Sequence, residues 1–466
     1  MINALKYICD ISGKIVLFAL LWASGHVSAG AADWPMWQYD AARSADTPVE
    51  LSEELHLQWK RQLPRPDRAW RFQRDDRGKL NFDVSYAPVV MGDRIFVPSS
   101  VTDSVTAYSI EDGSRQWRFH ANGPVRLAPA ARKGRVYFVS DDGYLYCVDA
   151  GDGELVWKFR GGPSDRRLLG NERIISVWAA RGGPVVKDGT VYFAAGLWPL
   201  HGVFIYALDA ENGDVEWVND TTSSDYVKLP HSGAAGYGGI APQGYLAASE
   251  DRLVVAGGRG MPAYLNRQTG EVEKANFRAK PDGGYAVHAV DGGGLGKKTN
   301  EMLNARVESV SDEIEGKIFE RLAAHDRLFV TTKGGTLYCF GPEEIEPVRH
   351  EYSPADLQKK TGRWSDVAED LLNELGETEG YALMLGAGSG DLLRELLTRS
   401  RLHIVVVEAD PGKVRKLREE LVRAGMYGRR AAVIEADPAD FSVRPYLFSM
   451  VVSEDATAAG IDAEES

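Results

Sequence analysis

The fold is decided by the stretch Asp142-Gly143-Tyr144-Leu145-Tyr146-Cys147-Val148-Asp149, followed by Gly153-Glu154 and Trp157. Aromatic and aliphatic residues fill its middle, and pairs of turn-forming residues bound it on both sides. Short apolar runs between such pairs are typical of antiparallel strands joined by tight turns. The stretch therefore predicts part of a small antiparallel sheet.

This stretch belongs to a unit of about 40 residues that occurs repeatedly along the chain. Forty residues separate Trp117 from Trp157, and the phrase Leu-Tyr-Cys occurs at 145–147 and again at 337–339. Repeats of this length are typical of arrays in which each unit packs against its neighbours. Five units share the pattern, at residues 87–117, 128–157, 183–217, 241–271 and 327–340.

One such sheet cannot bury both of its faces, because a single unit supplies too few strands. Packing successive sheets radially around an axis buries those faces and leaves only short edges. The tryptophan that follows each turn is large enough to fill the gap between neighbouring sheets. The repeats therefore predict an all-β propeller over residues 33–345, in which the tryptophans serve packing rather than ligand stacking.

The composition of the whole chain agrees with this architecture and limits the function. A length of 466 residues exceeds one compact core, so more than one domain is expected. The 49 glycines and 11 tryptophans fit repeated turns between packed sheets. Since 67 acidic residues outnumber 54 basic ones, the net charge is −13, which argues against nucleic acid as a partner.

The units resemble the pyrroloquinoline-quinone-like propeller repeat family, whose repeat joins a short strand, Asp-Gly, a Leu-Tyr phrase, Thr-Gly-Glu and tryptophan. Residues 33–44 resemble the opening of exported members, and Leu55-His56-Leu57-Gln58-Trp59 resembles a strand of the first blade. The resemblance implies a propeller fold. It leaves the function open, because the family includes dehydrogenases, outer-membrane assembly scaffolds of the BamB type and members without assigned chemistry.

The resemblance also implies what a quinone-dependent member needs, namely a disulfide between adjacent cysteines, an aspartate base and a calcium ion held by acidic and amide groups. Cys147 and Cys339 stand in separate repeats, and no acidic cluster has the spacing of a calcium loop. The sequence therefore argues against pyrroloquinoline quinone and calcium as cofactors and predicts no metal site.

Four polar residues are candidates for a ligand-binding face of the propeller. Arg181 and Arg259 stand among glycines, where a guanidinium can bind a carboxylate through two hydrogen bonds. His231 and Tyr237 stand in a long glycine-rich insertion, and such insertions gather on one face of repeat proteins. The alternative for the arginines is a solvated or turn-bonded side chain.

Residues 1–32 have the features of a secretory signal peptide, including Lys6, Lys14 and an apolar run from Ile15 to Ala23. That run is too short to span a bilayer as a helix. We therefore expect an exported protein of the periplasm or cell envelope, without a transmembrane span after cleavage, whose partners are envelope proteins or cell-wall components. An uncleaved anchor or a short buried helix is the alternative.

The pattern changes after Gly341-Pro342. Residues 346–380 predict a linker and a helix, and residues 381–466 predict an incomplete α/β Rossmann-like segment. In that segment apolar runs alternate with charged helical patterns, which indicates parallel strands joined by helices. Strands are expected at 381–385, 403–407, 431–435 and 447–452, and helices at 392–398 and 411–424.

The first of these strands leads into a Gly-x-Gly-x-Gly loop, and an acidic residue follows the second strand. This combination resembles the class I S-adenosylmethionine-dependent methyltransferases, and a nicotinamide-binding domain is the alternative. The resemblance implies S-adenosylmethionine as the cofactor. It places Gly386, Gly388 and Gly390 beside the methionine part, Glu408 on the ribose hydroxyls and Asp437 near the adenine.

Catalysis by this segment is a separate question. The family needs an acceptor-binding motif after the fourth strand, where this chain has Ser453-Glu454-Asp455. Three of the seven strands that the resemblance implies are missing, so we expect a truncated and degenerate segment with an exposed edge, half-covered faces and low stability. No catalytic residue is assigned.

These observations lead to one expected function and two alternatives. We expect an exported propeller that acts as a binding or scaffold module and carries a degenerate S-adenosylmethionine-binding segment. The first alternative is a methyltransferase that uses the propeller to recruit its substrate. The second is an oxidoreductase that resembles the quinoprotein dehydrogenases.

Overall fold

The computed structural model describes residues 32–70, 79–222, 225–228, 235–258, 260–275, 284–288, 296–357, 362–457 and 459–461. The expected signal peptide lies outside the described residues, except for Ala32. Among the described residues, no helix is long and apolar enough to cross a membrane.

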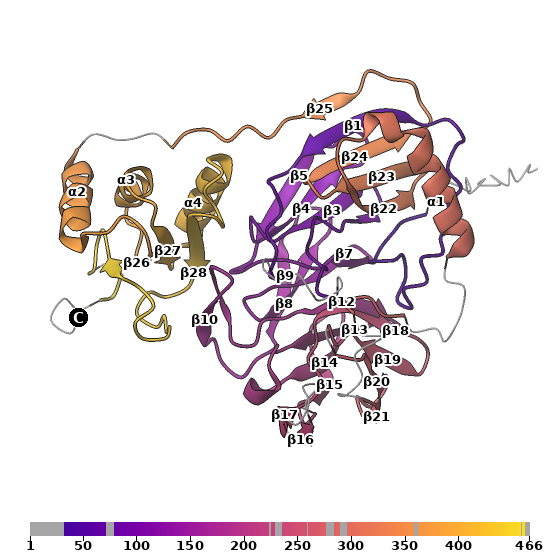
Figure 1. Ribbon diagram of the computed structural model, residues 1–466, viewed down its shortest axis with the longest axis horizontal. Coiled ribbons are helices and arrows are strands. Elements are labelled where there is room, and N and C mark those ends of the chain that lie inside the picture. The colour runs from indigo at the N-terminus through magenta and orange to yellow at the C-terminus, as the bar shows by residue number, and fades with distance from the viewer. Residues whose placement is uncertain are drawn as a thin grey trace, which may run out of the picture.

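Five antiparallel units build the all-β part of the described chain (Figure 1). The first two are separate sheets, and the third and fourth form one eight-stranded sheet because β12 pairs in parallel with β18. This arrangement confirms the prediction of a propeller-like fold. The strands are β2 (Val89–Met91), β3 (Arg94–Ser99), β4 (Ser104–Ser109) and β5 (Arg115–His120); β6 (Ala130–Arg132), β7 (Arg135–Val139), β8 (Tyr144–Asp149) and β9 (Leu155–Arg160); β12 (Gly182–Lys187), β13 (Thr190–Ala195), β14 (Phe204–Asp209) and β15 (Val215–Asn219); β18 (Gly244–Ala248), β19 (Arg252–Val255), β20 (Ala263–Asn266) and β21 (Val272–Lys274); and β22 (Ile318–Ala324), β23 (Arg327–Thr332) and β24 (Thr336–Gly341).

The strand β1 (His56–Gln62) joins the N-terminal end of the propeller to its last unit. It pairs antiparallel with β24 and in parallel with β25 (Val348–His350). The expectation that residues 55–59 form a strand of the first blade is therefore wrong. They contribute to the outer part of the last unit instead, where Trp59 takes the place that tryptophans hold in other units.

The tryptophans fill the gaps between neighbouring units, as the repeats predict. Trp117 covers Gly153 of the next unit so closely that a Cβ atom there would lie 2.5 Å from the indole ring. Gly153 also has a φ of 77°, so both its backbone and its neighbour require glycine. The indole N–H of Trp117 donates to the carbonyl oxygen of Ala150 over 3.0 Å. The same packing recurs in the pairs Trp59–Gly113, Trp157–Gly213 and Trp217–Gly270.

Several smaller elements extend from the five units (Figure 1). Two hairpins and one helix leave the regular pattern, and the helix α1 contacts β22. These elements are β10 (Arg167–Gly170) with β11 (Arg173–Ser176), β16 (Asp225–Lys228) with β17 (Ala235–Gly238), α1 (Lys297–Ser309), and the short 3-10 turns η1 (Pro199–His201) and η2 (Ser311–Glu313).

The C-terminal part contains a parallel four-stranded sheet with the strand order β28-β27-β26-β29. Three helices cover one of its faces, and the leucines of α3 and α4 form the apolar cluster there. The first and third strands have the predicted bounds, whereas the fourth begins three residues later than predicted. The elements are α2 (Arg363–Leu375), β26 (Tyr381–Leu385), α3 (Asp391–Arg399), β27 (His403–Glu408), α4 (Pro411–Arg423), β28 (Ala431–Glu435) and β29 (Met450–Val452).

The opposite face of this sheet meets the propeller. Ile174 of the β10–β11 hairpin lies in one apolar cluster with Leu383, Val405 and Val407 of the sheet. Figure 1 shows β10 beside β28, between the two parts of the molecule. The expected half-covered face is therefore partly covered, because the propeller supplies an apolar side chain where a further helix would otherwise be needed.

Candidate functional site

A chain of four buried charges lies in the propeller core. Asp141 accepts hydrogen bonds from Arg181 Nε at 2.7 Å and Nη2 at 2.8 Å, and from Arg126 Nε at 2.6 Å. Arg126 Nη1 also donates to Asp83 Oδ2 over 2.8 Å. All four residues are almost fully buried, so water screens these ion pairs little.

The two carboxylates of this chain have different electrostatic surroundings. Burial alone would raise the pKa of Asp141, but the two guanidinium groups beside it lower that pKa to about 2. Burial raises the pKa of Asp83 despite the nearby Arg126. Asp83 Oδ1 and Arg126 Nη2 have no hydrogen-bond partner among the described residues. Asp141 is therefore the carboxylate that stays charged in this group of four buried side chains.

The N-terminal segment 33–44 enters the middle of the propeller. Arg43 is fully buried and donates to the carbonyl oxygens of Leu246 at 2.7 Å and Pro184 at 2.9 Å, on the innermost strands of two units. Trp37 stacks on Tyr245 with ring centroids 4.0 Å apart. The segment thus fills part of the core that a ligand would need.

One carboxylate in contact with this segment, that of Glu320, has a raised pKa. Glu320 on β22 accepts a hydrogen bond from Trp37 Nε1 over 3.1 Å. Burial raises the pKa of Glu320 to about 7. The side chain is therefore close to half-protonated at neutral pH, which makes it a pH-sensitive contact of the N-terminal segment.

Of the four residues predicted for the ligand face, Arg181 and Tyr237 are described, and the structure does not bring these two together. Arg181 is buried in the charge chain, with its guanidinium 5.7 Å from the ring centre of Trp70. Tyr237 is exposed on the peripheral hairpin and packs edge-to-face on Tyr226. His231 and Arg259 lie outside the described residues. Arg181 is neither solvated nor free, because its charge is already neutralised.

The second candidate site is the glycine loop between β26 and α3. Gly386, Gly388 and Gly390 have φ angles of 75°, 52° and 77°, so the loop needs glycine at each of these positions. The loop leads into the N-terminus of α3, where backbone N–H groups without a partner inside the helix can bind an anion.

The carboxylate of Glu454 occupies this arrangement. Its oxygens accept hydrogen bonds from the backbone N–H groups of Ser389 at 2.6 Å, Gly390 at 3.3 Å and Leu392 at 2.7 Å. The hydroxyl of Ser389 donates a fourth bond over 2.9 Å. A Cβ atom at Gly388 would lie 2.5 Å from Glu454 Oε2, so the carboxylate fills the loop.

The two acidic residues predicted to bind the nucleoside lie at strand ends. Glu408 is 6% exposed and ends β27; its carboxylate accepts hydrogen bonds from the N–H groups of Ala387 at 2.9 Å and Asp410 at 3.0 Å. These bonds fix the carboxylate beside the loop. Asp437 is exposed and accepts a hydrogen bond from the N–H of Ala439. The structure therefore brings Glu408, but not the side chain of Asp437, into contact with the loop.

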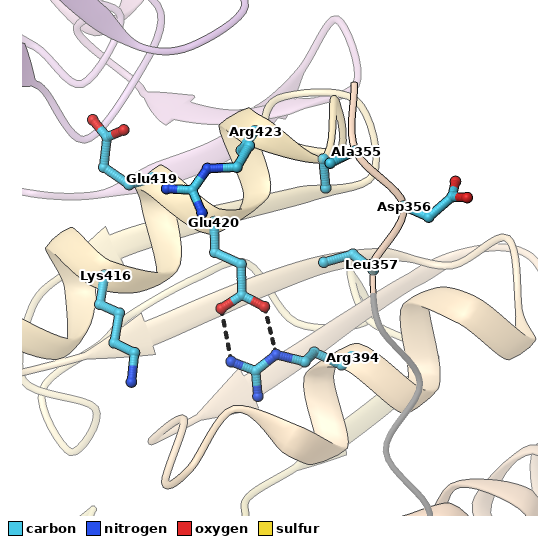
Figure 2. A pocket seen from close by; sticks show the side chains of 9 residues that line it. Ala355, Asp356, Leu357, Arg394, Lys416, Glu419, Glu420 and Arg423 are labelled. Carbon is cyan, nitrogen blue, oxygen red and sulfur yellow. Dashed lines mark hydrogen bonds and ion pairs between the residues drawn. The ribbon is translucent and has the colours of Figure 1, made fainter. Parts of the chain in front are cut away.

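A cleft of about 550 Å³ lies on the helical side of this part (Figure 2). Its floor carries Arg394 of α3, which donates to both carboxylate oxygens of Glu420 of α4 at 2.5 and 2.7 Å. Residues 355–357 form the opposite wall. Arg394 and Glu420 neutralise each other in this floor, and the charged side chains of Asp356, Lys416 and Arg423 also line the cleft.

Polar contacts also join the α/β part to the propeller. Glu419 of α4 lies 3.2 Å from Arg115 and 3.6 Å from Arg118. The side-chain amide of Asn122 donates to the carbonyl oxygen of Glu435 and accepts from its N–H, at 3.1 and 2.9 Å. Asn122 therefore binds the end of β28 as a neighbouring strand would.

Sequence reasoning missed the partners of both sites. Asp141 stands directly before Asp142-Gly143, so a buried acid after a buried strand was the available signal. Glu454 stands in the segment after the fourth predicted strand, but no local sequence pattern connects it to the glycine loop. The contact between Glu454 and Ser389 joins residues 65 positions apart.

Comparison with known proteins identifies relatives of the propeller. The family described as "Outer membrane protein assembly factor BamB" matches residues 56–179. The dehydrogenase subunit of the quinone alcohol dehydrogenase of Gluconacetobacter polyoxogenes is 30% identical over 125 residues, which cover 26% of this chain and 14% of that protein. The quinohemoprotein alcohol dehydrogenase of Comamonas testosteroni is 20% identical, with a TM-score of 0.39 over 54% of this chain and 42% of that chain. BamB of Moraxella catarrhalis is 13% identical, with a TM-score of 0.28 over 54% and 82%.

The family match supports the predicted PQQ-like and BamB-like repeats in the propeller. The curated relative is named as a quinone alcohol dehydrogenase, so it conflicts with the expectation that a quinone cofactor is unlikely. This chain spans about a seventh of the length of that relative, since 14% of it is covered.

The described residues of the propeller core do not fit a quinone held by calcium. Asp83 and Asp141 are paired with Arg126 and Arg181, so the four charges cancel and leave no anionic ligand set for a divalent cation. Cys147 and Cys339 are buried, unpaired and in different sheets. Nowhere in the described ranges do three His, Cys, Asp or Glu residues group in a way that would hold a metal ion.

Proposed function

We propose that the chain is an exported propeller scaffold that holds a methyltransferase-type α/β unit, and that this unit binds S-adenosylmethionine at its glycine loop. The observation that carries the scaffold role is the packing of Ile174 into the apolar face of the sheet. The N-terminal sequence and the outer-membrane assembly family matched by residues 56–179 support export to the cell envelope. Envelope proteins or cell-wall components are the proposed external partners.

The proposed cofactor site uses residues at the carboxyl ends of the parallel strands. Gly386, Gly388 and Gly390 leave room for a close approach to the backbone, and Glu408 offers a fixed carboxylate to hydroxyl donors. Asp437 lies after the neighbouring strand and completes the proposed nucleoside side. Bound S-adenosylmethionine would supply a transferable methyl group. We assign no catalytic residue, and we propose a binding rather than a transferring unit.

The scaffold role is tested by changing the propeller side of the contact. Ile174→Asp places a charge in the apolar cluster, so we expect faster hydrogen exchange in β26, β27 and β28 of the full chain. Leu155→Asp on β9 of the propeller is the matched control, because Leu155 is 45% exposed. Equal exchange in both variants would show that the propeller does not support the α/β unit.

The cofactor role is tested by calorimetric titration of the full chain with S-adenosylmethionine. We expect binding that Glu408→Ala weakens and that Glu374→Gln, an exposed change on α2, leaves unaltered. Binding that is insensitive to Glu408→Ala would refute the proposed site. Transfer of a labelled methyl group to an envelope fraction would instead favour the alternative of an active methyltransferase that recruits its substrate through the propeller.

A quinone-dependent oxidoreductase is the second candidate, and the curated relative favours it. Adding pyrroloquinoline quinone and calcium to the full chain tests it directly. We expect neither a new absorbance band nor alcohol-dependent dye reduction, because the core charges are paired internally. Dye reduction that Asp141→Asn abolishes would establish the oxidoreductase instead.

A further inference from the structure

The most specific unexplained contact in the molecule is the one between Glu454 and the glycine loop. A single carboxylate takes three backbone donors and one hydroxyl at the N-terminus of a nine-residue helix. Such donors attract negative charge because the helix dipole and the N–H groups at the helix start act together. The N–H of Gly390 also donates to the carbonyl oxygen of Ala387 over 2.7 Å, so the N–H groups of Ser389 and Leu392 are the main backbone donors. A second carboxylate cannot use the same donors while Glu454 remains.

The segment that carries Glu454 also covers the loop at a second point. Ala459 is buried, and a Cβ atom at Gly386 would lie 2.9 Å from the Ala459 methyl group. The N–H of Ala459 donates to the carbonyl oxygen of Asp455 over 3.1 Å, which gives this stretch a helical turn. Residues 453–457 and 459–461, called the strap below, therefore touch both ends of the glycine loop.

The strap lies at the edge of the α/β sheet. It follows β29, a three-residue edge strand that pairs only with β26 among the described strands. Val451 of β29 is 59% exposed, so the strand buries little apolar surface. Segments with few buried apolar contacts open at low free-energy cost. We therefore expect that the strap can leave the loop without unfolding of the sheet.

We infer that Glu454 is a built-in occupant of the cofactor cradle and that the strap must leave before S-adenosylmethionine binds. This rests on the proposed function, because it concerns the same loop. The side-chain carboxylate of Glu454 is chemically equivalent to the α-carboxylate of an amino-acid-type ligand such as S-adenosylmethionine. The two carboxylates compete for the N–H groups of Ser389, Gly390 and Leu392. The apparent affinity for S-adenosylmethionine is therefore the affinity of the open form multiplied by the fraction of molecules in which the strap is open.

The test compares the full chain with Glu454→Ala, with the isosteric Glu454→Gln and with Glu374→Gln as a charge-matched control. Hydrogen exchange without ligand reports the contact itself. We expect exchange in residues 386–392 to accelerate about tenfold in both Glu454 variants and to stay unchanged in the control. Exchange in β26 and β27 should remain slow, which shows that the sheet stays folded. Unchanged exchange in residues 386–392 would overturn the inference.

Titration with S-adenosylmethionine then reports the competition. We expect the Glu454 variants to bind about ten- to a hundredfold more tightly than the unaltered chain and the control, because no internal carboxylate has to be displaced. Equal affinity in all proteins would overturn the inference and leave the cofactor site standing. Faster exchange without binding by any protein would overturn the proposed cofactor, and the competition with it.

Discussion

Replacing Asp141 by asparagine tests whether the buried charge chain holds the propeller together. Asp141 accepts three hydrogen bonds from Arg126 and Arg181, all shorter than 2.9 Å. Asparagine has nearly the same shape but no charge. In the variant Arg126 keeps its ion pair with Asp83, whereas Arg181 loses the carboxylate with which it forms its ion pair.

Two independent routes give the size of the expected effect. Removing one partner of a buried ion pair costs about 3–5 kcal/mol, because the other charge stays buried without compensation. The lowering of the Asp141 pKa from 3.8 to about 2 corresponds to roughly 2 kcal/mol of stabilisation of the charged form. We therefore expect the propeller to lose about 3 kcal/mol in its free energy of unfolding.

Calorimetric melting of the full chain measures this loss, and we expect the propeller transition to fall by roughly 5 °C or more. Asp83→Asn is the matched control. Because burial raises the pKa of Asp83, its charged form contributes less and the control should cost less. A loss below about 1 kcal/mol for Asp141→Asn, or an equal loss for both variants, would refute the reasoning.

The lowered pKa of Asp141 also sets how the stability of the propeller changes with pH. A carboxylate whose pKa is lowered in the folded state stabilises the fold above its unfolded pKa of 3.8. That stabilisation disappears as the pH falls toward about 2. Asp141→Asn should therefore remove this acid-dependent part of the stability curve.

Three further predictions test other contacts. The pKa of Glu320 is raised from 4.5 to about 7, so this residue stabilises the fold below pH 4.5 and loses that contribution as the pH rises through 7. The melting temperature of the unaltered chain should therefore fall between these pH values, and that of Glu320→Gln should depend less on pH there. Gly153→Ala should destabilise the chain by about 1–3 kcal/mol more than Gly134→Ala, because both glycines have positive φ but only Gly153 lies against Trp117, and equal melting temperatures would contradict the packing role. The contact between His120, Arg118, Arg115 and Glu419 holds the pKa of Glu419 at about 2, so acidification below its usual pKa of 4.5 should lower the protection of Arg115–His120 against hydrogen exchange, relative to the intrinsic rate at each pH, and Glu419→Gln should reduce that loss of protection.

The sequence predicted the propeller well because its signal is local and repeated. The turn glycines and the tryptophans recur with the repeat, and each pair meets across neighbouring units, as Trp117 and Gly153 do. A parallel sheet was predicted on the same basis, since its strands are short apolar runs. The helix α1 escaped prediction because it buries only Thr299 and Leu303 and so carries almost no apolar period.

The sites were predicted less completely, because their contacts join residues that are distant in sequence. Arg181 was a candidate, but its partner Asp141 lies 40 positions earlier. The strand β1 was placed in the wrong unit for the same reason, since its partner β24 lies at the other end of the propeller. The sequence pattern locates the glycine loop, but it does not identify Glu454 as the residue whose carboxylate fills the loop.

The two internal carboxylates differ in a way that decides which site responds to a ligand. Asp141 is enclosed among the sheets, and its bonds are lost only if the propeller core opens. Glu454 sits on a strap that follows a short edge strand, so its bonds can be exchanged for those of a ligand at low free-energy cost. A carboxylate or another anion of suitable size should therefore bind at the glycine loop and not in the propeller core.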